Sequence, residues 1–118
     1  MSLIVPIQTT NLGPGKTGTI EPSRVIAGEP ITQSWPQVAD LDGAVDAGVW
    51  EITPSENVSI KDGISEFCLI LEGLIELTAD TGESWTFRKG DAFLMKDGWR
   101  GKWKTIEKTR KLYVIVSK

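Results

Sequence analysis

The stretch EFCLILEG, residues 66–73, is the longest nearly continuous apolar run in the chain, and it ends in a glycine. Successive side chains of a β-strand point to opposite faces. One face of this strand would therefore carry Glu66, Cys68 and Ile70, and the other would carry Phe67, Leu69 and Leu71. Because both faces are mostly apolar, both need cover, as in a strand at the centre of a closed or two-layered structure.

The composition indicates one ordinary globular domain. The chain has 118 residues, of which 40% are hydrophobic and 25% are charged. Thirteen basic and sixteen acidic residues give a net charge of -3, which argues against nucleic-acid binding, because that needs a basic excess on one face. No apolar stretch approaches the roughly 20 residues of a membrane span. The start MSLIVP lacks the basic region of a signal peptide.

The chain has a single Cys and no His. One Cys cannot close an intrachain disulfide, so a reducing, cytoplasmic location is expected. The absence of His excludes a Ser-His-Asp triad, a Cys-His pair and imidazole-ligated zinc or iron. Any metal would have to be held by carboxylates and other oxygens.

Residues 1–47 are punctuated by glycine and proline, which exclude a helix longer than a turn or two. We expect this part to be an N-terminal arm with one or two short edge strands, such as residues 25–27, within the same domain as the core. Its apolar start, Leu3, Ile4, Val5 and Ile7, is expected to dock on an apolar surface.

From residue 48 onward, short apolar segments alternate with turn signals at nearly regular spacing. The expected strands are 49–53, 58–61, 66–71, 74–78, 84–88, 92–95, 102–106 and 112–116. A hairpin turn is predicted at Glu72-Gly73, and further turns at 62–63, 89–91 and 97–98. Many short strands without helical periodicity indicate an all-β sandwich or barrel, whose core is residues 48–118.

Three segments carry a family resemblance. Glu66, six intervening residues and Gly73, together with GDAF at 90–93 and DGWRGKW at 97–103, resemble the two sequence motifs of the cupin superfamily. The ending RKLY at 110–113 resembles the small single-domain cupins related to (S)-ureidoglycine aminohydrolase. The resemblance covers about residues 48–116. It implies a cupin-like (RmlC-like) jelly-roll β-barrel, or double-stranded β-helix, with function in the barrel mouth.

The same resemblance implies a metal site whose ligands this chain lacks. In the cupins that this chain resembles, the metal ligands are two His and a following Glu from the first motif and a third His from the second motif. Counting along this sequence puts residues 60 and 62, or 59 and 61, at the first two positions and Gly101 at the third. Only Glu66 remains, and one carboxylate does not hold a divalent ion at ordinary concentration. We therefore expect no metal and no other cofactor.

Glu66 is open to two interpretations. It can be a ligand-binding or acid–base carboxylate with a raised pKa. It can also be a relic of the family that pairs with a nearby Lys or Arg or reaches solvent, which is the interpretation we favour. Glu66→Gln is then expected to be tolerated, because burying an uncompensated carboxylate costs more than burying an amide. A large loss of stability would instead indicate a buried ion pair.

Aromatic side chains are candidate ligand contacts. Trp50 and Trp103, together with Trp99, would form an aromatic pocket for a planar or cationic ligand. The alternative for each single Trp is core and interface packing, which is the commoner role.

Three further side chains complete the candidate binding site. Cys68 shares a strand face with Glu66, but with no His to activate it we expect an inert, buried thiol. Lys111 and Tyr113 share a face of the last strand, and in the related family such a pair would contact an acidic substrate. Packing of the terminal strand explains Tyr113 equally well.

These residues support three hypotheses about function. The favoured one is a metal-free cupin that binds a small molecule in a pocket containing Glu66, Trp50, Trp103 and Lys111. The second is an enzyme of the ureidoglycine aminohydrolase type that acts on a small nitrogenous metabolite, with an oxygen-ligated metal or none. The third is a non-catalytic dimerising scaffold, which a barrel mouth plugged by side chains would support.

The central strand also predicts a homodimer. If Glu66 faces inward, as the resemblance implies, then Phe67, Leu69 and Leu71 face outward. Each would forfeit roughly 1.5–3 kcal/mol in water relative to burial, and together they would form a patch unusual for a monomer. The arm is a poor continuous lid because of its Pro and Gly content, and a two-fold interface is the commonest solution.

Overall fold

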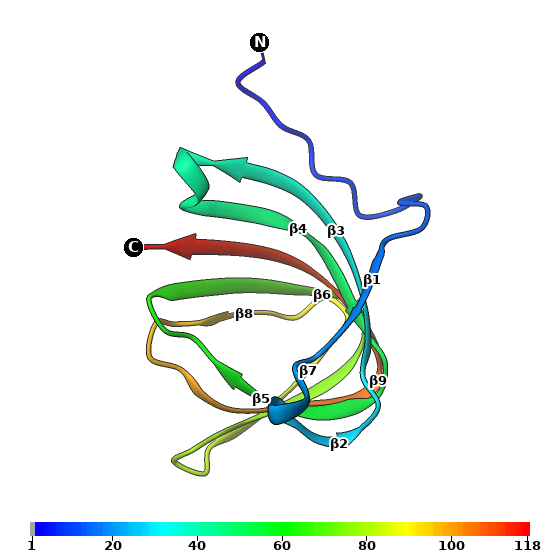
Figure 1. The fold of residues 1–118 in the computed structure, drawn as a ribbon, viewed down its shortest axis with the longest axis vertical. Helices are drawn as coiled ribbons and strands as arrows, with labels where there is room; N and C mark the ends of the chain where they lie inside the picture. The colour runs from blue at the N-terminus through cyan, green and yellow to red at the C-terminus, as the bar shows by residue number, and fades with distance from the viewer. Residues whose placement is uncertain (1) are drawn as a thin grey trace.

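The computed structural model describes residues 2–118, which form an almost entirely β-structure (Figure 1). The strands are β1 (Lys16–Thr19), β2 (Val25–Gly28), β3 (Ile31–Asp40), β4 (Val45–Ile52), β5 (Ser55–Ile60), β6 (Ile64–Ala79), β7 (Ser84–Arg88), β8 (Ala92–Met95) and β9 (Arg100–Ser117). Two single-turn helices, η1 (Pro22–Arg24) and η2 (Leu41–Gly43), lie between strands. Within residues 2–118 no helix has the length and hydropathy needed to span a bilayer.

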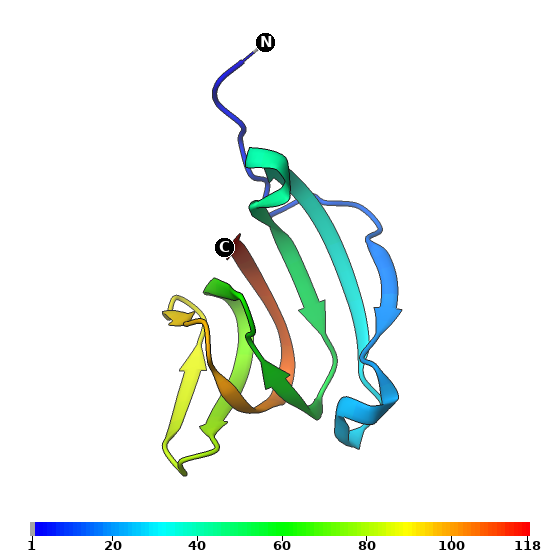
Figure 2. The same cartoon turned by 60° about the vertical axis from the view of Figure 1, so that its left-hand side comes forward.

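All nine strands belong to one curled sheet. The strand order is β1-β3-β4-β9-β5-β2, and β6 pairs with β9 as well as with β7 and β8. Every pairing is antiparallel. Figures 1 and 2 show the sheet curling back on itself, which confirms the predicted all-β jelly-roll architecture.

The two longest strands connect the two sides of the curl. β6 has 16 residues and β9 has 18. The first half of β6 pairs with β8 and with the end of β9, whereas the second half pairs with β7 and with the start of β9. On the other edge of β9, β4 pairs with its end and β5 with its start. Both long strands therefore pass from one side of the curl to the other.

Gly73 lies at a bend within β6 and not in a hairpin turn. The ladder between β6 and β9 shifts register between Ile70 and Ile75, and Gly73 has a φ of 108°. Irregularities of this kind bend a strand and increase its twist. The predicted turn at Glu72-Gly73 is therefore wrong, and so is the predicted break between 106 and 112. Apolar residues that need burial continue beyond Gly73 in β6 and beyond Ile106 in β9, so the two strands stay paired past these positions.

The two faces of β6 are arranged as the alternation predicts. Glu66, Cys68 and Ile70 are buried, whereas Phe67 is 39% exposed. The same inward face continues past the bend with buried Ile75 and Leu77. The main core cluster consists of Cys68, Ile70, Ile75, Leu77, Met95 and Trp103.

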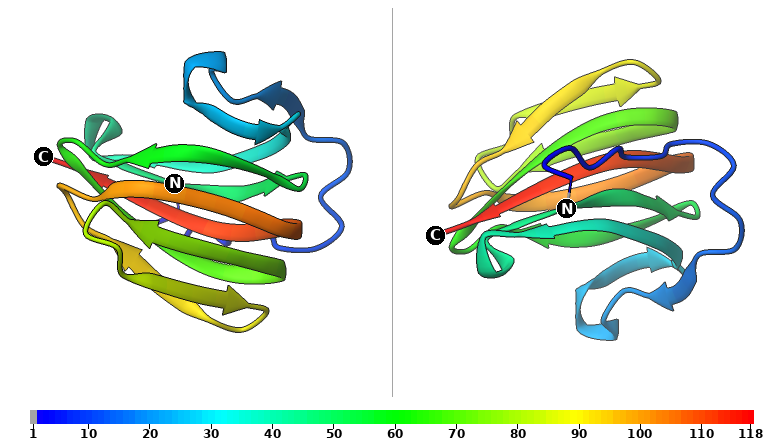
Figure 3. Two further views of the ribbon diagram at one scale, coloured as in Figure 1. Left: turned by 90° about the horizontal axis from the view of Figure 1, so that it is seen from below. Right: turned by 90° about the horizontal axis from the view of Figure 1, so that it is seen from above.

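The segment predicted as an arm contains more sheet than expected. β3 is a ten-residue strand between β1 and β4, and residues 25–27 lie in β2 at the end of the strand order. Residues 2–15 form the arm itself, whose first residues extend away from the sheet (Figure 2) and whose later residues pass around one end of the strands to reach β1 (Figure 3). Trp35 Nε1 donates to the Gly13 carbonyl at 3.1 Å, and Gln8 exchanges two hydrogen bonds with Gln37. The apolar start of the arm remains exposed, with Leu3 at 94%.

Candidate functional site

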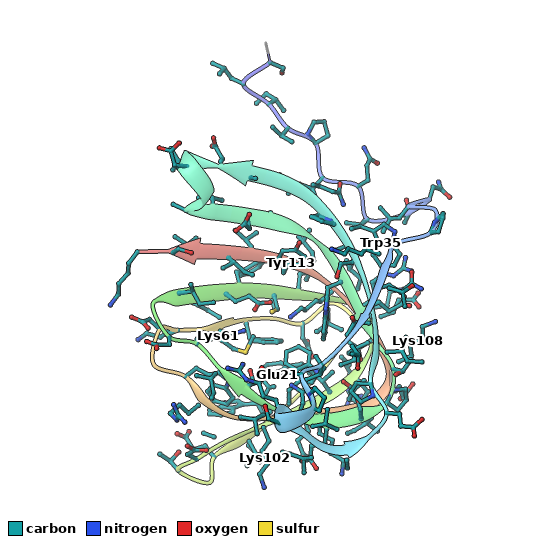
Figure 4. All side chains as sticks on the ribbon, in the orientation of Figure 1. Glu21, Trp35, Lys61, Lys102, Lys108 and Tyr113 are labelled. Atoms are coloured by element: carbon teal, nitrogen blue, oxygen red, sulfur yellow. The ribbon has the colours of Figure 1, made fainter. Side chains whose placement is uncertain are left out.

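A cavity of about 540 Å³ lies on the concave side of the curled sheet. Its walls include side chains of β3, β4, β5, β6 and β9, and Arg24 of η1 and Glu21 just before this helix also line it. Figure 4 shows Glu21, Lys61 and Tyr113 on this concave side, and Trp35 and Lys108 on the outside. The volume lies within the range of about 300–1,000 Å³ that is usual for small-molecule pockets.

The structure brings the predicted site residues together. Those that line the cavity are Trp50, Glu66, Trp103, Lys111 and Tyr113. They come from three strands that are adjacent in the sheet, because β9 pairs with both β4 and β6. The sixth residue, Cys68, is fully buried behind this wall.

Glu66 is the centre of a buried ion-pair network. Its carboxylate accepts from Lys111 Nζ at 2.6 Å and contacts Lys61 Nζ at 2.9 Å. Burial raises the pKa of Glu66, but the charges and hydrogen bonds of Lys111 and Lys61 outweigh burial and bring this pKa to about 2. Glu66 is therefore ionised at neutral pH. The alternative of an acid–base carboxylate with a raised pKa is wrong.

Lys111 fills the aromatic box that the sequence predicts. Its Nζ lies 4.5 Å from the ring centroid of Trp50 and 4.7 Å from that of Trp103, and the two rings meet edge to face at 6.1 Å. Burial lowers the pKa of Lys111, but neighbouring Cys68 and Glu66 more than offset this, so the net direction is upward. A cation on an aromatic face is stabilised electrostatically. The protein's own ammonium group thus takes the place that was predicted for a cationic ligand.

Cys68 supports the network without offering a reactive thiolate. Its Sγ lies 3.3 Å from Glu66 Oε2, to which it donates. Burial raises the pKa of the Cys68 thiol to about 12, although the positive charge of Lys111 acts in the opposite direction. The thiolate is the nucleophilic form of cysteine, so the predicted inert role agrees with this geometry.

Trp99 belongs to a different cavity. This second space, of about 350 Å³, is almost entirely apolar and is lined by Leu77, Trp85, Phe87, Phe93, Leu94, Met95, Lys96 and Trp99. Met95 lines both cavities, and its side chain forms part of the wall between them. The predicted grouping of Trp99 with Trp50 and Trp103 is therefore wrong, because Trp99 approaches the wall from the loop between β8 and β9.

Lys61 is the functional side chain that the sequence analysis does not single out as a contact. It follows β5 directly, and residues 59 and 61 are one of the two pairs counted as positions for the missing His ligands. Ser59 and Lys61 both line the cavity, so a cation stands beside Glu66 where the resemblance implies a metal. In residues 2–118 no cluster of three or more His, Cys, Asp or Glu could hold a metal ion.

Tyr113 presents a neutral phenol to the cavity. Burial is the main factor that raises its pKa, and the negative charges of Asp46 and Glu66 add to this effect. Gly48, its register partner on β4, leaves room for the ring, since a Cβ at Gly48 would lie 2.9 Å from the Tyr113 hydroxyl oxygen. Tyr113 can therefore donate a hydrogen bond into the cavity at neutral pH.

Comparison with solved structures identifies similar folds. A Pseudomonas syringae pv. tomato protein of unknown function from the DUF861 family is 30% identical, with a TM-score of 0.76 over 89% of this chain and 44% of that one. This chain thus spans less than half of that protein. A DUF861 family protein from Thermotoga maritima is 38% identical over 55% of this chain and 73% of that one, with a TM-score of 0.53.

More distant structures support the fold alone. The EutQ protein of Clostridium difficile is 14% identical, with a TM-score of 0.64 over 85% of this chain and 80% of that one. No curated protein matches the sequence. The sequence pattern of the EutQ-like cupin domain matches residues 39–113, which is more than half of the chain and includes the strands that carry Trp50, Glu66 and Lys111. The chain therefore belongs to the EutQ-like cupin domain family.

Proposed function

We propose that this protein is a metal-free cupin that binds a small anionic molecule in the barrel cavity, with Lys61 as its principal charged contact. The observation that carries the proposal is the charge of the buried network. Two ammonium groups surround a single carboxylate at 2.6 and 2.9 Å, which gives this network one net positive charge, whereas the remaining charged side chains of the lining, Glu21, Arg24 and Asp46, add one net negative charge elsewhere in the cavity wall. A buried excess charge is stabilised by a counter-ion of opposite sign.

Lys61 is the member of the network that remains available to a ligand. The Lys111 ammonium is enclosed by Glu66 and two indole rings. The Lys61 ammonium has three N–H donors, one of which is used by Glu66, and its side chain is 15% exposed. Two donors therefore remain for a ligand. Asp46 also lines the cavity but does not belong to this network. It and Glu66 both pair with Ile115 of β9, from opposite sides, so the two residues are separated by two strand spacings, or about 10 Å.

Binding of simple carboxylates tests this function. Isothermal titration with acetate, butyrate and hexanoate is expected to show binding that butylamine and butanol do not show. Lys61→Gln should weaken carboxylate binding by about 10- to 100-fold, since a hydrogen bond to a charged group contributes about 1.5–3 kcal/mol.

Lys108→Gln is the matched control for that experiment. Lys108 lies on the outside of the sheet (Figure 4) and its side chain is 63% exposed, so its loss should leave binding unchanged. Equal binding of carboxylates, amines and alcohols, or no binding of any carboxylate at millimolar concentration, would contradict the proposal.

Two other functions remain alternatives. An open cavity favours ligand binding over a purely structural scaffold, for which the mouth would be plugged by side chains. Activity of the ureidoglycine aminohydrolase type stays a prediction, because the descriptions of the relatives above name no such reaction. A stoichiometric, tightly held manganese or zinc in the purified protein would favour this enzyme over the metal-free binding function.

We also propose that the protein is a homodimer that buries the outward face of the first half of β6 and of the end of β9 that pairs with it. Phe67 and Val116 lie on this face and are 39% and 50% exposed. Sedimentation equilibrium at micromolar concentration should give a dimer, and Phe67→Lys should give a monomer, because a charge in an apolar interface is costly. Ile106→Lys, at a similar 43% exposure but in the first half of β9, should leave the dimer intact. A monomeric parent protein would contradict the dimer.

A further inference from the structure

The charged side chains that line the barrel cavity are separated by sign. Lys61 and Lys111 contact Glu66 in the network that carries one net positive charge. Asp46 lines the same cavity from β4, where it is partly buried, and within residues 2–118 its carboxylate takes part in no ion pair. A carboxylate that is partly removed from water is stabilised by a nearby cation.

The pairing of the strands fixes how far Asp46 lies from the network. Asp46 and Glu66 pair with Ile115 from opposite sides, so two strand spacings, or about 10 Å, separate their Cα atoms. Directly paired residues lie on the same face of a sheet, and all three residues line the cavity. The cavity wall between the two carboxylates is therefore the apolar side chain of Ile115.

Tyr113 lies beside this row. It precedes Ile115 by two residues on β9, so both side chains point to the same face, and both line the cavity. Burial is the main cause that raises the pKa of Tyr113, and the negative charges of Asp46 and Glu66 add to it, which agrees with a phenol close to both carboxylates. The face of a neutral aromatic ring also attracts a cation.

The other two charged residues of the lining offer a poorer site for a cation. Glu21 and Arg24 line the cavity at η1, where both are exposed. They carry opposite charges and are three residues apart in the chain, and solvent screens charges that are exposed. Among the described residues of the lining, Asp46 is therefore the partly buried carboxylate that lacks a counter-ion.

From this arrangement we infer that the ligand is a zwitterion, with its anionic group at Lys61, an ammonium group at Asp46 and a short apolar chain over Ile115 between them. The inference rests on the proposed function, because it takes Lys61 as the contact of the anionic group. It names the ω-amino acids, whose two charges stand at opposite ends of an aliphatic chain, as the ligand class. An α-amino acid carries both charges at one end and cannot reach both groups.

Isomeric amino acids test the inference. The probes are butyrate, pentanoate and hexanoate with their ω-amino and 2-amino derivatives, and the dissociation constants are measured by isothermal titration at pH 7. For at least one chain length the parent protein should bind the ω-amino acid about tenfold more tightly than the plain acid, which corresponds to about 1.4 kcal/mol. The 2-amino isomer has the same composition and charges, and it should bind no more tightly than the plain acid.

Two substitutions locate the ammonium site. Asp46→Asn removes the charge and keeps the shape of the side chain, so it should abolish the preference for the ω-amino acid and leave the affinity for the plain acid within about twofold. Glu21→Gln is the matched control, because it removes a different carboxylate from the lining of the same cavity, and it should retain the preference. A second variant, Asp46→Ser, repeats the comparison with a smaller side chain.

The outcomes separate the inference from the function on which it rests. If the parent protein binds plain and ω-amino acids equally at every length, and Lys61→Gln weakens both, the ammonium site is wrong and the anion site stands. If no acid binds, both are wrong. An equal gain for the 2-amino isomer would overturn the separation of the two charges. A preference that survives in both Asp46 variants, or that disappears in Glu21→Gln, would overturn the assignment to Asp46, and so would loss of plain-acid binding in both Asp46 variants.

Discussion

Replacing Glu66 by glutamine is expected to lower the free energy of unfolding by about 3–5 kcal/mol at neutral pH. The substitution removes the negative charge that lies 2.6 Å from Lys111 Nζ and 2.9 Å from Lys61 Nζ. Lys61 can turn toward the cavity and solvent. The Lys111 side chain is 9% exposed and would be left as a buried charge without its counter-ion. Urea unfolding of Glu66→Gln and the parent protein at pH 7 measures the difference.

Glu51 on the outer face provides a matched control. It also contacts two basic groups, Arg110 Nη2 at 2.8 Å and Lys108 Nζ at 3.3 Å, but their side chains are 30% and 63% exposed. Glu51→Gln should therefore cost about 1 kcal/mol or less. Similar small losses for both variants would contradict the buried network. They would restore the sequence-based expectation that Glu66→Gln is tolerated, which assumed a carboxylate without a buried cation.

The same network predicts how stability depends on pH. The pKa of Glu66 falls from 4.5 to about 2 in the folded protein. A lowered pKa means that the stabilisation is fully present above the unfolded value and is lost as pH falls from about 4.5 to about 2. The contribution of Glu66 across this window is about 3 kcal/mol. In Glu66→Gln this part of the acid dependence should be absent, whereas Glu51→Gln should retain it.

The alternation of side chains along β6 was predictable because it is a local property of a strand. Burial of Glu66, Cys68 and Ile70 on one face follows directly from a period of two residues. The turn at Gly98 could also be predicted from the sequence, since Asp-Gly before a new apolar segment is a strong turn signal. These features depend on neighbours in the sequence, and the structure has them as expected.

The ion pairs at the site depend on strand register, which the sequence does not reveal. Lys111 is 45 residues from Glu66 and reaches it only because β9 pairs with β6 in one particular alignment. A pairing of Glu66 with some Lys or Arg was foreseen, but neither partner was identified. Lys61 carried a signal that was available, because it stood at a counted His position.

Gly73 shows the same limit for the backbone. A glycine after an apolar run is compatible with a hairpin turn and with a bulge, and both use positive φ. The choice depends on whether β9 continues alongside, and in this protein β9 continues through Thr109, which lies beside Gly73. A bend that is packed against another strand leaves less room for a side chain than an exposed turn does. A substitution at Gly73 is therefore expected to have a large effect on stability.

Gly73→Ala is expected to destabilise the protein by at least about 3 kcal/mol, or to prevent folding. A Cβ at this position would overlap Thr109 Oγ1 and would lie 2.6 Å from both the Lys108 carbonyl oxygen and Thr109 Cα. Two of these atoms belong to the backbone of β9, which is held on both sides and cannot move away cheaply. The φ of 108° adds strain for any residue with a Cβ. Urea unfolding followed by Trp fluorescence measures the loss, and circular dichroism shows whether the variant folds.

Gly82→Ala separates the two causes of that loss. Gly82 has a φ of 96°, close to that of Gly73, but a Cβ there would meet nothing within 4 Å. It should therefore cost only the backbone strain, about 1–2 kcal/mol. The excess loss in Gly73→Ala then measures the close approach of β6 and β9 at the bend. If the two variants lose the same stability, the strands are not in close contact at Gly73, and a hairpin turn at this position would again be the better description.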